Sequence, residues 1–138
     1  MTKYILDTHV LLWFLENNEK LSKNIHEDIE YFQHEYFVSF LSLMEIDNLN
    51  KLGKIDLKYS FNELIERLNK SCIEIIFSSL RDLETLFDLE MKIIGKKQHG
   101  DYIDRMIIAT AIVNRYTCIS ADTKFPDYRK LGLKLVEV

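Results

Sequence analysis

The chain is predicted to fold as an α/β protein, a three-layer α/β/α sandwich, on the basis of two patterns in its sequence. Short runs rich in Ile, Val, Tyr and Phe recur along it, as in buried strands. Longer segments with apolar residues at a 3.6-residue period separate these runs, as in helices packed on a core. Because strands that alternate with helices of this length form right-handed βαβ units, we expect a mainly parallel sheet covered on both faces.

Five strands and six helices follow from these patterns. The strands are expected at Tyr4–Leu6, Tyr36–Phe40, Ile73–Phe77, Tyr116–Ser120 and Lys134–Val138. The helices are expected at Thr8–Leu15, Ser22–Phe32, Leu41–Leu52, Ser60–Lys70, Leu80–Ile94 and Asp101–Arg115. Gly53 is a C-cap signal for the third helix, and Phe61, Leu64, Ile65 and Leu68 give the fourth one apolar face. The 138 residues suit one domain, residues 1–138.

Composition narrows the class of protein. The chain is 47% hydrophobic and 29% charged, as in ordinary soluble globular proteins. No apolar run approaches the roughly 18 residues that span a bilayer, and the first residues lack the features of a secretory signal. We therefore expect a cytoplasmic protein with no membrane association.

The cysteines and histidines do not suggest a metal site. Cys72 and Cys118, the only cysteines, each sit in an apolar strand-like run, so we expect two buried thiols that act as small hydrophobes. The four histidines share no ligand-like spacing. The formal net charge of −4 is not typical of a nucleic-acid-binding protein. Carboxylates gathered in one cleft, with lysines around it, would nevertheless hide such a function in the net charge.

Acidic residues stand where the predicted strands end. Asp7 ends the first strand, and Glu45 lies one turn into the helix that follows the second. Asp104 opens the sixth helix, and Asp122 follows the fourth strand. In open parallel sheets, ligands bind outside the carboxyl ends of the strands, so these acids are candidates for one site.

Each acid taken alone also has a structural explanation as a helix cap or turn residue. The candidates are an N-cap at Asp7 or Thr8, a capping box from Ser42 to Glu45, acids at the positive helix end at Asp101 and Asp104, and an Asx turn at Ser120–Thr123. Taken together, four carboxylates at one sheet edge would repel each other strongly, and such clusters are kept mainly to hold a hard cation.

Four segments carry a family resemblance. "DTHVLLW", "SFLSLMEI", "DYIDRMIIATA" and "SADTKF", in this order, resemble the four signatures of PIN-domain nucleases, and are most similar to the VapC-type toxins of bacterial toxin–antitoxin systems. The resemblance runs from Lys3 to Val138. It implies a PIN-like sheet with strand order 3-2-1-4-5, which places the first strand at the centre.

The resemblance also implies roles for individual residues. The four family acids match Asp7, Glu45, Asp104 and Asp122, and supporting positions match Thr8, Ser120 and Asp101. Where the family subgroup with an acid at position 101 usually has a proline next, this chain has Tyr102, which leaves Asp101 as either an N-cap or an outer ligand. We expect Asp7 to serve as the central ligand, Thr8 to cap the first helix, and Trp13 to lie in the core or a dimer surface.

The implied activity is RNA hydrolysis assisted by one or two Mg²⁺ or Mn²⁺ ions. Asp7 and Asp104 would be direct ligands, Glu45 a direct or water-mediated ligand and base, and Asp122 a ligand through water or a second ion. Lysines near the cleft would neutralise phosphates, with Lys51, Lys54 and Lys124 as candidates. The implied partners are single-stranded or structured RNA such as transfer RNA, a cognate antitoxin, and a second copy in a homodimer.

Three other classes of protein share parts of this pattern. A phosphoacceptor receiver domain would need an acidic pair at the first corner and a lysine ending the last strand, and a D-x-D-G-T phosphatase would need Asp where His9 stands. The remaining alternative is a catalytically silent PIN fold that serves as an RNA- or protein-binding module. Such proteins generally lose one or more acids, whereas this chain keeps all four.

Overall fold

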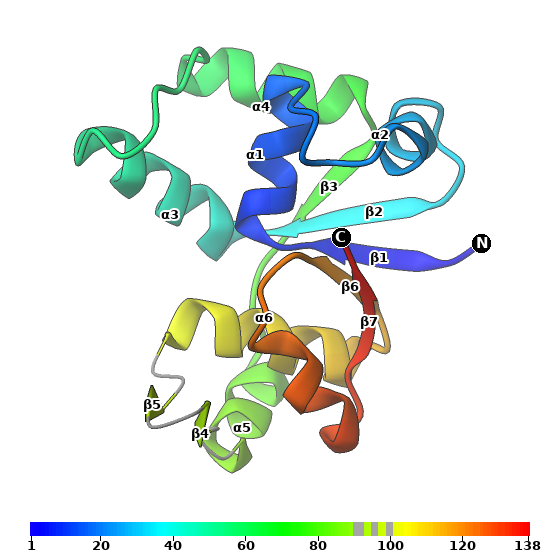
Figure 1. The fold of residues 1–138 in the computed structure, drawn as a ribbon, viewed down its shortest axis with the longest axis vertical. Helices are drawn as coiled ribbons and strands as arrows, with labels where there is room; N and C mark the ends of the chain where they lie inside the picture. The colour runs from blue at the N-terminus through cyan, green and yellow to red at the C-terminus, as the bar shows by residue number, and fades with distance from the viewer. Residues whose placement is uncertain (90–92, 95–96, 99–100) are drawn as a thin grey trace.

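A five-stranded parallel sheet forms the centre of the molecule (Figure 1). The computed structural model describes residues 1–89, 93–94, 97–98 and 101–138. In order across the sheet, the strands are β3 (Ile73–Ile76), β2 (Glu35–Ser39), β1 (Lys3–Leu6), β6 (Thr117–Ser120) and β7 (Lys134–Glu137). This confirms the predicted order 3-2-1-4-5. The last residue of β1 is therefore flanked on both sides by the ends of neighbouring strands, Val38 and Ile119.

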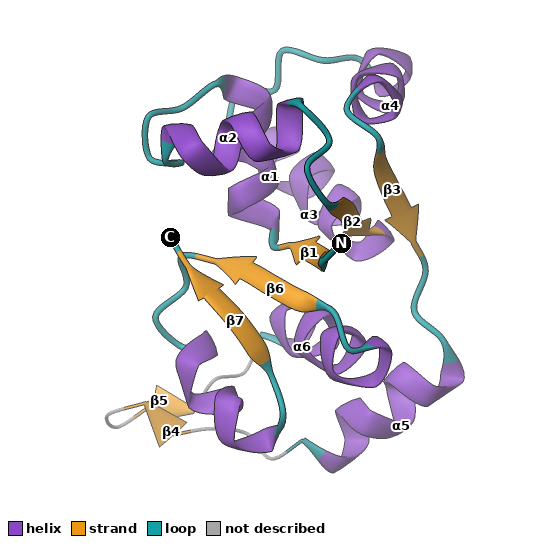
Figure 2. Cartoon of the chain, turned by 90° about the vertical axis from the view of Figure 1, so that its right-hand side faces the viewer, coloured by secondary structure: helices purple, strands orange, loops and turns teal. Residues whose placement is uncertain are grey.

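Helices cover both faces of this sheet, which confirms the three-layer architecture (Figure 2). One layer holds α1 (Thr8–Glu16), α2 (Lys23–Glu30), α3 (Phe40–Lys51) and α4 (Phe61–Lys70). The other holds α5 (Leu80–Asp88), α6 (Tyr102–Asn114) and the 3₁₀ helix η1 (Phe125–Leu131). Among the described residues, no helix is long and apolar enough to cross a membrane.

The alternation of side chains along the strands divides the core in two. Leu6 and Ile119 pack with the first helical layer, whereas their neighbours Ile5 and Cys118 pack with the second. All four of these side chains are buried, so the central strands are apolar on both faces. Polar groups of β1 and β6 are thereby confined to the strand ends, where the candidate site lies.

Two parts of the second layer differ from the prediction. The fifth helix ends at Asp88 rather than Ile94, because Leu89 takes an extended conformation and turns into the second core. Ile93–Ile94 form strand β4, which pairs antiparallel with β5 (Lys97–Gln98), while residues 90–92 of the predicted helix lie outside the described residues. A short apolar run fits a strand or a helix equally well, so periodicity could not separate the two.

The 3₁₀ helix η1 was not predicted, because it is only seven residues long and contains a proline near its start. Phe125 and Tyr128, three residues apart, eclipse one another on its inner side and are completely buried. The segment thus closes the second core directly after the loop that carries Asp122.

The two thiols differ in their surroundings. Cys118 is completely buried, as predicted, and burial raises its pKa. The prediction for Cys72 was wrong: it is exposed and adopts a left-handed φ of 53°, because it forms the turn before β3 rather than part of the strand. Gly53, with a φ of 72°, follows the end of α3 as predicted for a C-cap glycine.

A buried carboxylate ties α5 to α6. Asp82 completes a capping box with Ser79 and also accepts hydrogen bonds from the Thr110 hydroxyl (3.1 Å) and the Asn114 amide (3.4 Å). Since Asp82 is 1% exposed, these donors of α6 have a fixed acceptor shielded from water. This contact anchors the C-terminal half of the helix whose first turn carries Asp104.

Asp82→Ala is expected to lower the free energy of unfolding by about 3 kcal/mol, because it removes a helix cap and leaves buried donors unpaired. Urea unfolding followed by circular dichroism measures the change. Asp88→Ala, at an exposed position of the same helix, is the control and should change the value by less than about 0.5 kcal/mol. Equal effects of the two substitutions would contradict the anchoring role.

Candidate active site

Asp7 is fixed at the end of the central strand by two hydrogen bonds. Its Oδ1 accepts from the backbone N–H of Val10 at 2.9 Å, which makes Asp7 the N-cap of α1, and its Oδ2 accepts from the Ser120 hydroxyl. The expectation that Thr8 caps this helix was therefore wrong. A carboxylate has about four lone-pair sites, so these two bonds orient the group and still leave acceptor capacity toward the cleft.

Thr8 instead joins α1 to α3. Its buried hydroxyl donates to the Ser42 hydroxyl oxygen at 3.0 Å. The predicted capping box at Ser42 was also wrong, because α3 begins earlier and Ser39 caps it by accepting from the N–H of Leu41. Glu45 lies one turn after Ser42 on the same side of α3, so the Thr8–Ser42 bond holds the helix turn that carries Glu45 beside α1.

Asp101 is the N-cap of α6. Its Oδ1 accepts from the backbone N–H groups of Ile103 (2.9 Å) and Asp104 (3.1 Å). Of the two roles that the sequence left open for Asp101, capping is therefore present in the structure. Asp104 follows in the first turn of the helix and is half-buried, whereas Asp101 is exposed.

Ser120 links Asp7 to the loop that follows β6. While its hydroxyl donates to Asp7, its oxygen accepts from the N–H of Asp122 at 3.0 Å. Asp122 in turn accepts from the backbone N–H of Lys124 at 2.8 Å, the Asx turn that the sequence predicted. The ammonium of Lys124 lies 3.6 Å from the second carboxylate oxygen of Asp122.

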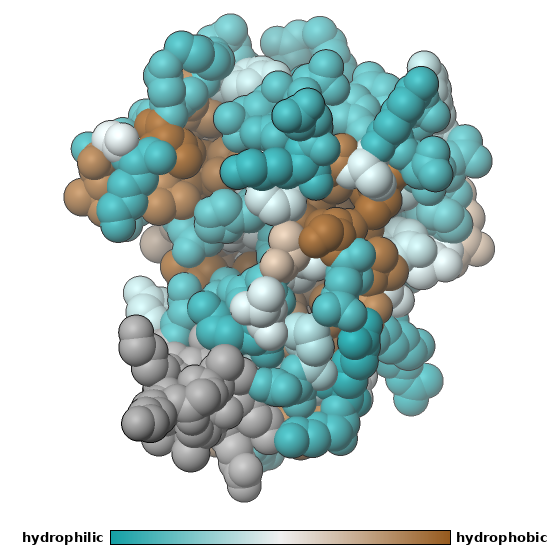
Figure 3. Space-filling model, in the orientation of Figure 1, coloured by the Kyte–Doolittle hydropathy of each residue, from teal (hydrophilic) through white to brown (hydrophobic). Residues whose placement is uncertain are grey.

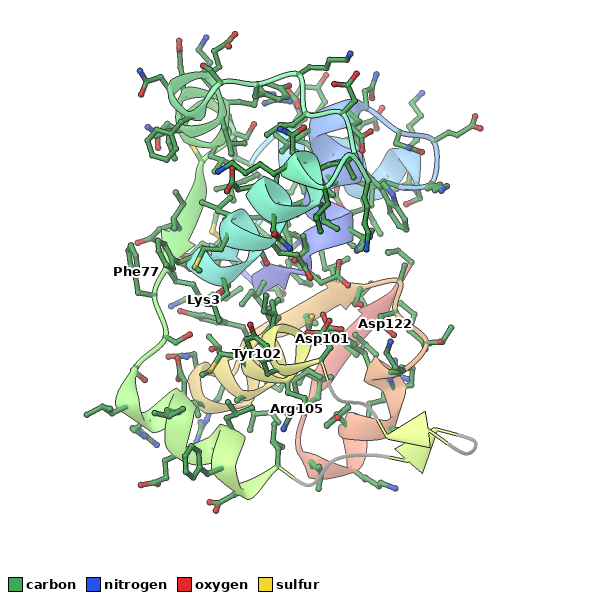
Figure 4. The ribbon with its side chains drawn as sticks, turned by 90° about the vertical axis from the view of Figure 1, so that its left-hand side faces the viewer. Lys3, Phe77, Asp101, Tyr102, Arg105 and Asp122 are labelled. Atoms are coloured by element: carbon green, nitrogen blue, oxygen red, sulfur yellow. The ribbon has the colours of Figure 1, made fainter. Side chains whose placement is uncertain are left out.

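These elements surround one cleft of about 470 Å³ at the carboxyl edge of the sheet. In Figure 4 the labelled Asp101 and Asp122 lie near one another, although they come from α6 and from the loop after β6. The cleft contains all four predicted acids, together with Asp101, Thr8 and Lys124. Its complete lining is Asp7, Thr8, His9, Trp13, Glu45, Asp101, Asp104, Ala121, Asp122, Thr123 and Lys124.

Two of the three predicted lysines lie elsewhere. Lys51 is exposed at the end of α3, where its ammonium pairs with Asp47 at 3.0 Å, and Lys54 is exposed three residues further on. Neither lines the cleft. Any contact of these two lysines with a ligand would therefore be outside the acidic site.

Two aromatic side chains of the lining were not predicted as site residues. His9 and Trp13 are both on α1, and Trp13, expected in the core or a dimer surface, is half-buried with one part in the cleft and one part against the first core. The signal that could have found them is their spacing. They are four positions apart on α1, which begins at Thr8, so both lie on one helix face.

Two acids of the cleft, Asp104 and Asp7, have raised pKa values. The pKa of Asp104 is raised to about 8, first by burial and then by the negative charges of Asp101, Asp122, Glu45 and Asp7. Burial also raises the pKa of Asp7, opposed by the hydrogen bond from Ser120. Near neutral pH, full ionisation of this cluster therefore requires a positive charge to balance it.

The donor set fits a magnesium ion held partly through water. Among the described residues, no three His, Cys, Asp or Glu side chains form a ready-made group of direct ligands. Mg²⁺ does not need one, since it usually keeps several waters and takes only one or two carboxylates. Among the acids of the cleft, Asp7 is held in one orientation by hydrogen bonds and Asp104 is half-buried, so oxygen donors for such an ion are present.

A parallel sheet with clustered carboxylates at its carboxyl edge defines an α/β protein with an acidic cleft where such sheets bind ligands. The family model described as "PIN domain" matches residues 4–131, and the chain belongs to this family, whose members are generally nucleases. No curated protein matches the chain.

Solved structures share this fold over nearly the whole chain. One is in VapBC2 from Rickettsia felis bound to a DNA fragment from the promoter, with a TM-score of 0.70, 18% identity and 99% of each chain covered. Another is in DNA-bound VapBC from Salmonella typhimurium, with a TM-score of 0.63, 18% identity, and coverage of 99% of this chain and 98% of that one. A third is in a toxin–antitoxin complex from Klebsiella pneumoniae, with a TM-score of 0.58, 19% identity, and coverage of 98% and 99%.

The raised pKa of Asp104 predicts how stability without divalent ions depends on pH. An unfolded Asp has a pKa near 3.9, so between about pH 4 and pH 8 the folded state binds the extra proton. The free energy of unfolding should then fall as the pH rises through this window. In Asp104→Asn the fall should be smaller, as measured by urea unfolding in EDTA at pH 5 to 8.

Asp56→Asn is the control for this measurement, because Asp56 is exposed and outside the cleft. It should retain the wild-type pH profile. Addition of Mg²⁺ at pH 8 should stabilise the wild type more than Asp104→Asn, because a ligand stabilises the state that binds it. A wild-type profile that is flat over this range would refute the electrostatic account.

Proposed function

We propose that the protein is an endoribonuclease that depends on Mg²⁺ or Mn²⁺ and is the toxin of a toxin–antitoxin pair. The observation that carries the proposal is the convergence of Asp7, Glu45, Asp104 and Asp122 on one cleft from four separate parts of the chain. Membership of the PIN family supports a nuclease, and the similar folds in VapBC complexes support the toxin role.

In this mechanism the chain holds and orients the reactants. Asp7 and Asp104 would hold the ion directly, and Glu45 and Asp122 would hold it directly or through water. One or two ions, when bound, would supply an acidified water and neutralise charge on the scissile phosphate. Ser120 contributes by keeping the Asp7 carboxylate in one orientation.

The reaction is the hydrolysis of a phosphodiester bond. Water attacks phosphorus and gives one proton to Glu45, the bond from phosphorus to the 3′ oxygen breaks, and that oxygen takes a proton from solvent water. Lys124 is the cation within the cleft that would pair with a phosphate beside the scissile one. Lys51 and Lys54 would reach only phosphates further along the RNA, because they lie outside the cleft.

Protein partners form the second part of the proposal. A groove of about 490 Å³ between α3, α4 and β3 is lined mainly by apolar side chains, among them the exposed Phe40, Met44, Phe61 and Phe77. Figure 3 shows apolar surface over the end of α3 and the segment after it. An apolar surface of this kind suits a protein partner, here the cognate antitoxin or the second subunit of a homodimer. Both partners and the RNA are expected in the cytoplasm.

The rival proposal is a silent PIN fold that only binds RNA or protein. Loss of site acids would favour it, yet all four are present and share the cleft. Cleavage of RNA by the purified protein separates the two proposals, because a binding module would leave the RNA intact.

Asp7→Asn and Asp104→Asn should each lower Mg²⁺-dependent RNA cleavage by roughly 100-fold or more, since each removes an anionic ligand. Both variants should stay folded, because Asn caps a helix as well as Asp does and because Asp104→Asn relieves repulsion. Asp47→Asn, on α3 outside the cleft, is the control and should cleave like the wild type. Full cleavage by both site variants would refute the metal-cluster mechanism, and EDTA should abolish cleavage by the wild type.

The toxin role is tested in cells. Induced expression of the wild type should slow growth and produce new RNA ends, which sequencing maps to the cleaved bonds. Asp7→Asn should have no such effect, because its cleft lacks the oriented carboxylate. Equal slowing of growth by both proteins would refute the proposal that RNA cleavage makes the protein toxic.

A further inference from the structure

The acidic cleft has an aromatic wall, formed by His9 and Trp13 of α1. Both residues line the cleft, and their ring centroids lie 6.5 Å apart with the rings at 66°. His9 is exposed, and Trp13 is half-buried because part of its ring packs against the first core. The wall is thus partly anchored, and it rises from the helix that Asp7 caps.

Two lysine ammonium groups, those of Lys20 and Lys124, lie near this aromatic wall. The Nζ of Lys20 lies 5.9 Å from the centroid of the Trp13 ring, near the outer limit of about 6 Å for a cation–π contact. Lys20 is exposed, so a stronger anionic partner can draw its ammonium away from the ring. Lys124 lines the same cleft as the wall, beside Asp122.

A ligand that uses this cleft must match three kinds of surface. The carboxylates require a cation and a group that the cation can polarise, and the wall requires a flat partner with a π face. Lys124 within the cleft, and Lys20 beside the Trp13 ring but outside the cleft lining, require anions. An unpaired nucleotide supplies an anionic phosphate for the lysines and a flat base for the aromatic wall. The scissile phosphate supplies the group that the cation can polarise. Proteins that bind single-stranded nucleic acids combine basic grooves with aromatic side chains on which the bases stack.

We propose that an unpaired base next to the scissile phosphate stacks on Trp13 and meets His9 at its edge, because the two rings lie at 66°, while Lys20 moves from the Trp13 ring to a neighbouring phosphate. This inference rests on the proposed ribonuclease function and adds to it a base-positioning role for Trp13 and His9. The cleaved segment is single-stranded or looped, because the bases of a duplex are already stacked on one another and paired. Trp13 and His9 are then positioning residues for the scissile bond.

Trp13 is the only tryptophan of the chain, so its fluorescence reports directly on the wall. The full-length protein is titrated with a single-stranded RNA octamer in Ca²⁺ instead of Mg²⁺, and a gel confirms that the RNA stays intact. The octamer should quench Trp13 emission as it binds. The same RNA as a duplex, and a polyphosphate chain of equal charge, should leave the emission nearly unchanged because neither offers an unstacked base.

Substitutions separate stacking from folding. Trp13→Leu should weaken octamer binding about tenfold, measured by the anisotropy of labelled RNA, and Trp13→Phe should restore most of that loss. His9→Ala should weaken binding by a few fold, and it is safe for folding since His9 is exposed. Phe87→Leu removes an exposed aromatic ring on α5 outside the cleft and should bind RNA like the wild type.

Cleavage kinetics in Mg²⁺ complete the test. Trp13→Leu should raise KM about tenfold and change kcat much less, whereas a loss of folded protein would lower kcat and leave KM unchanged.

Each possible result of these experiments either supports or overturns the stacking role of Trp13. RNA that binds and is cleaved without a change in Trp13 emission would overturn the stacking role and leave the proposed ribonuclease standing. Equal quenching by duplex or polyphosphate would overturn it in the same way. A chain that neither binds nor cleaves single-stranded RNA would overturn both the inference and the proposed function.

Discussion

The candidate site depends on one constraint, the fixed orientation of a buried carboxylate at the end of the central strand. Asp7 accepts one hydrogen bond from the backbone of α1 and one from Ser120 of β6. Since β1 lies between β2 and β6, these bonds connect the middle of the sheet to both its next strand and its first helix. The Ser120 oxygen also accepts from the backbone N–H of Asp122, so one hydroxyl group contacts two of the four acidic residues.

The same arrangement sets function against stability. Hydrophobic burial on both sides of the sheet leaves the strand ends as the place for polar groups, and there the carboxylates crowd together. Burial, and then the negative charges of the neighbouring carboxylates, raises the pKa of Asp104 to about 8. A cation in the cleft would offset this repulsion, as the proposed metal-assisted hydrolysis requires. Water-mediated coordination by Mg²⁺ is compatible with acids that do not form a tight ligand group.

Sequence patterns predicted the fold and the four acids of the cleft, but not its aromatic residues, the place of Lys51 and Lys54, or the details of the contacts. The strand order and the meeting of four acids follow from strand alternation and topology, which are properties of long segments. The N-cap of α1 and the partner of Ser42 depend on where a helix begins to within one residue, and the sequence misplaced both. Cys72 and the end of α5 were wrong for a related reason, since local apolar runs do not show where the chain turns. Trp13 was assigned to the core because periodicity cannot tell a core position from one that borders a cleft.

The division of the core into two halves has a consequence for how the molecule holds its shape. Glu45 belongs to a helix of one layer and Asp104 to a helix of the other, and only the sheet edge with Asp7 lies between them. A cation bound by both carboxylates would link the two helical layers across the edge of the sheet. Binding of such a cation would therefore resist separation of the two helical layers at this edge of the sheet.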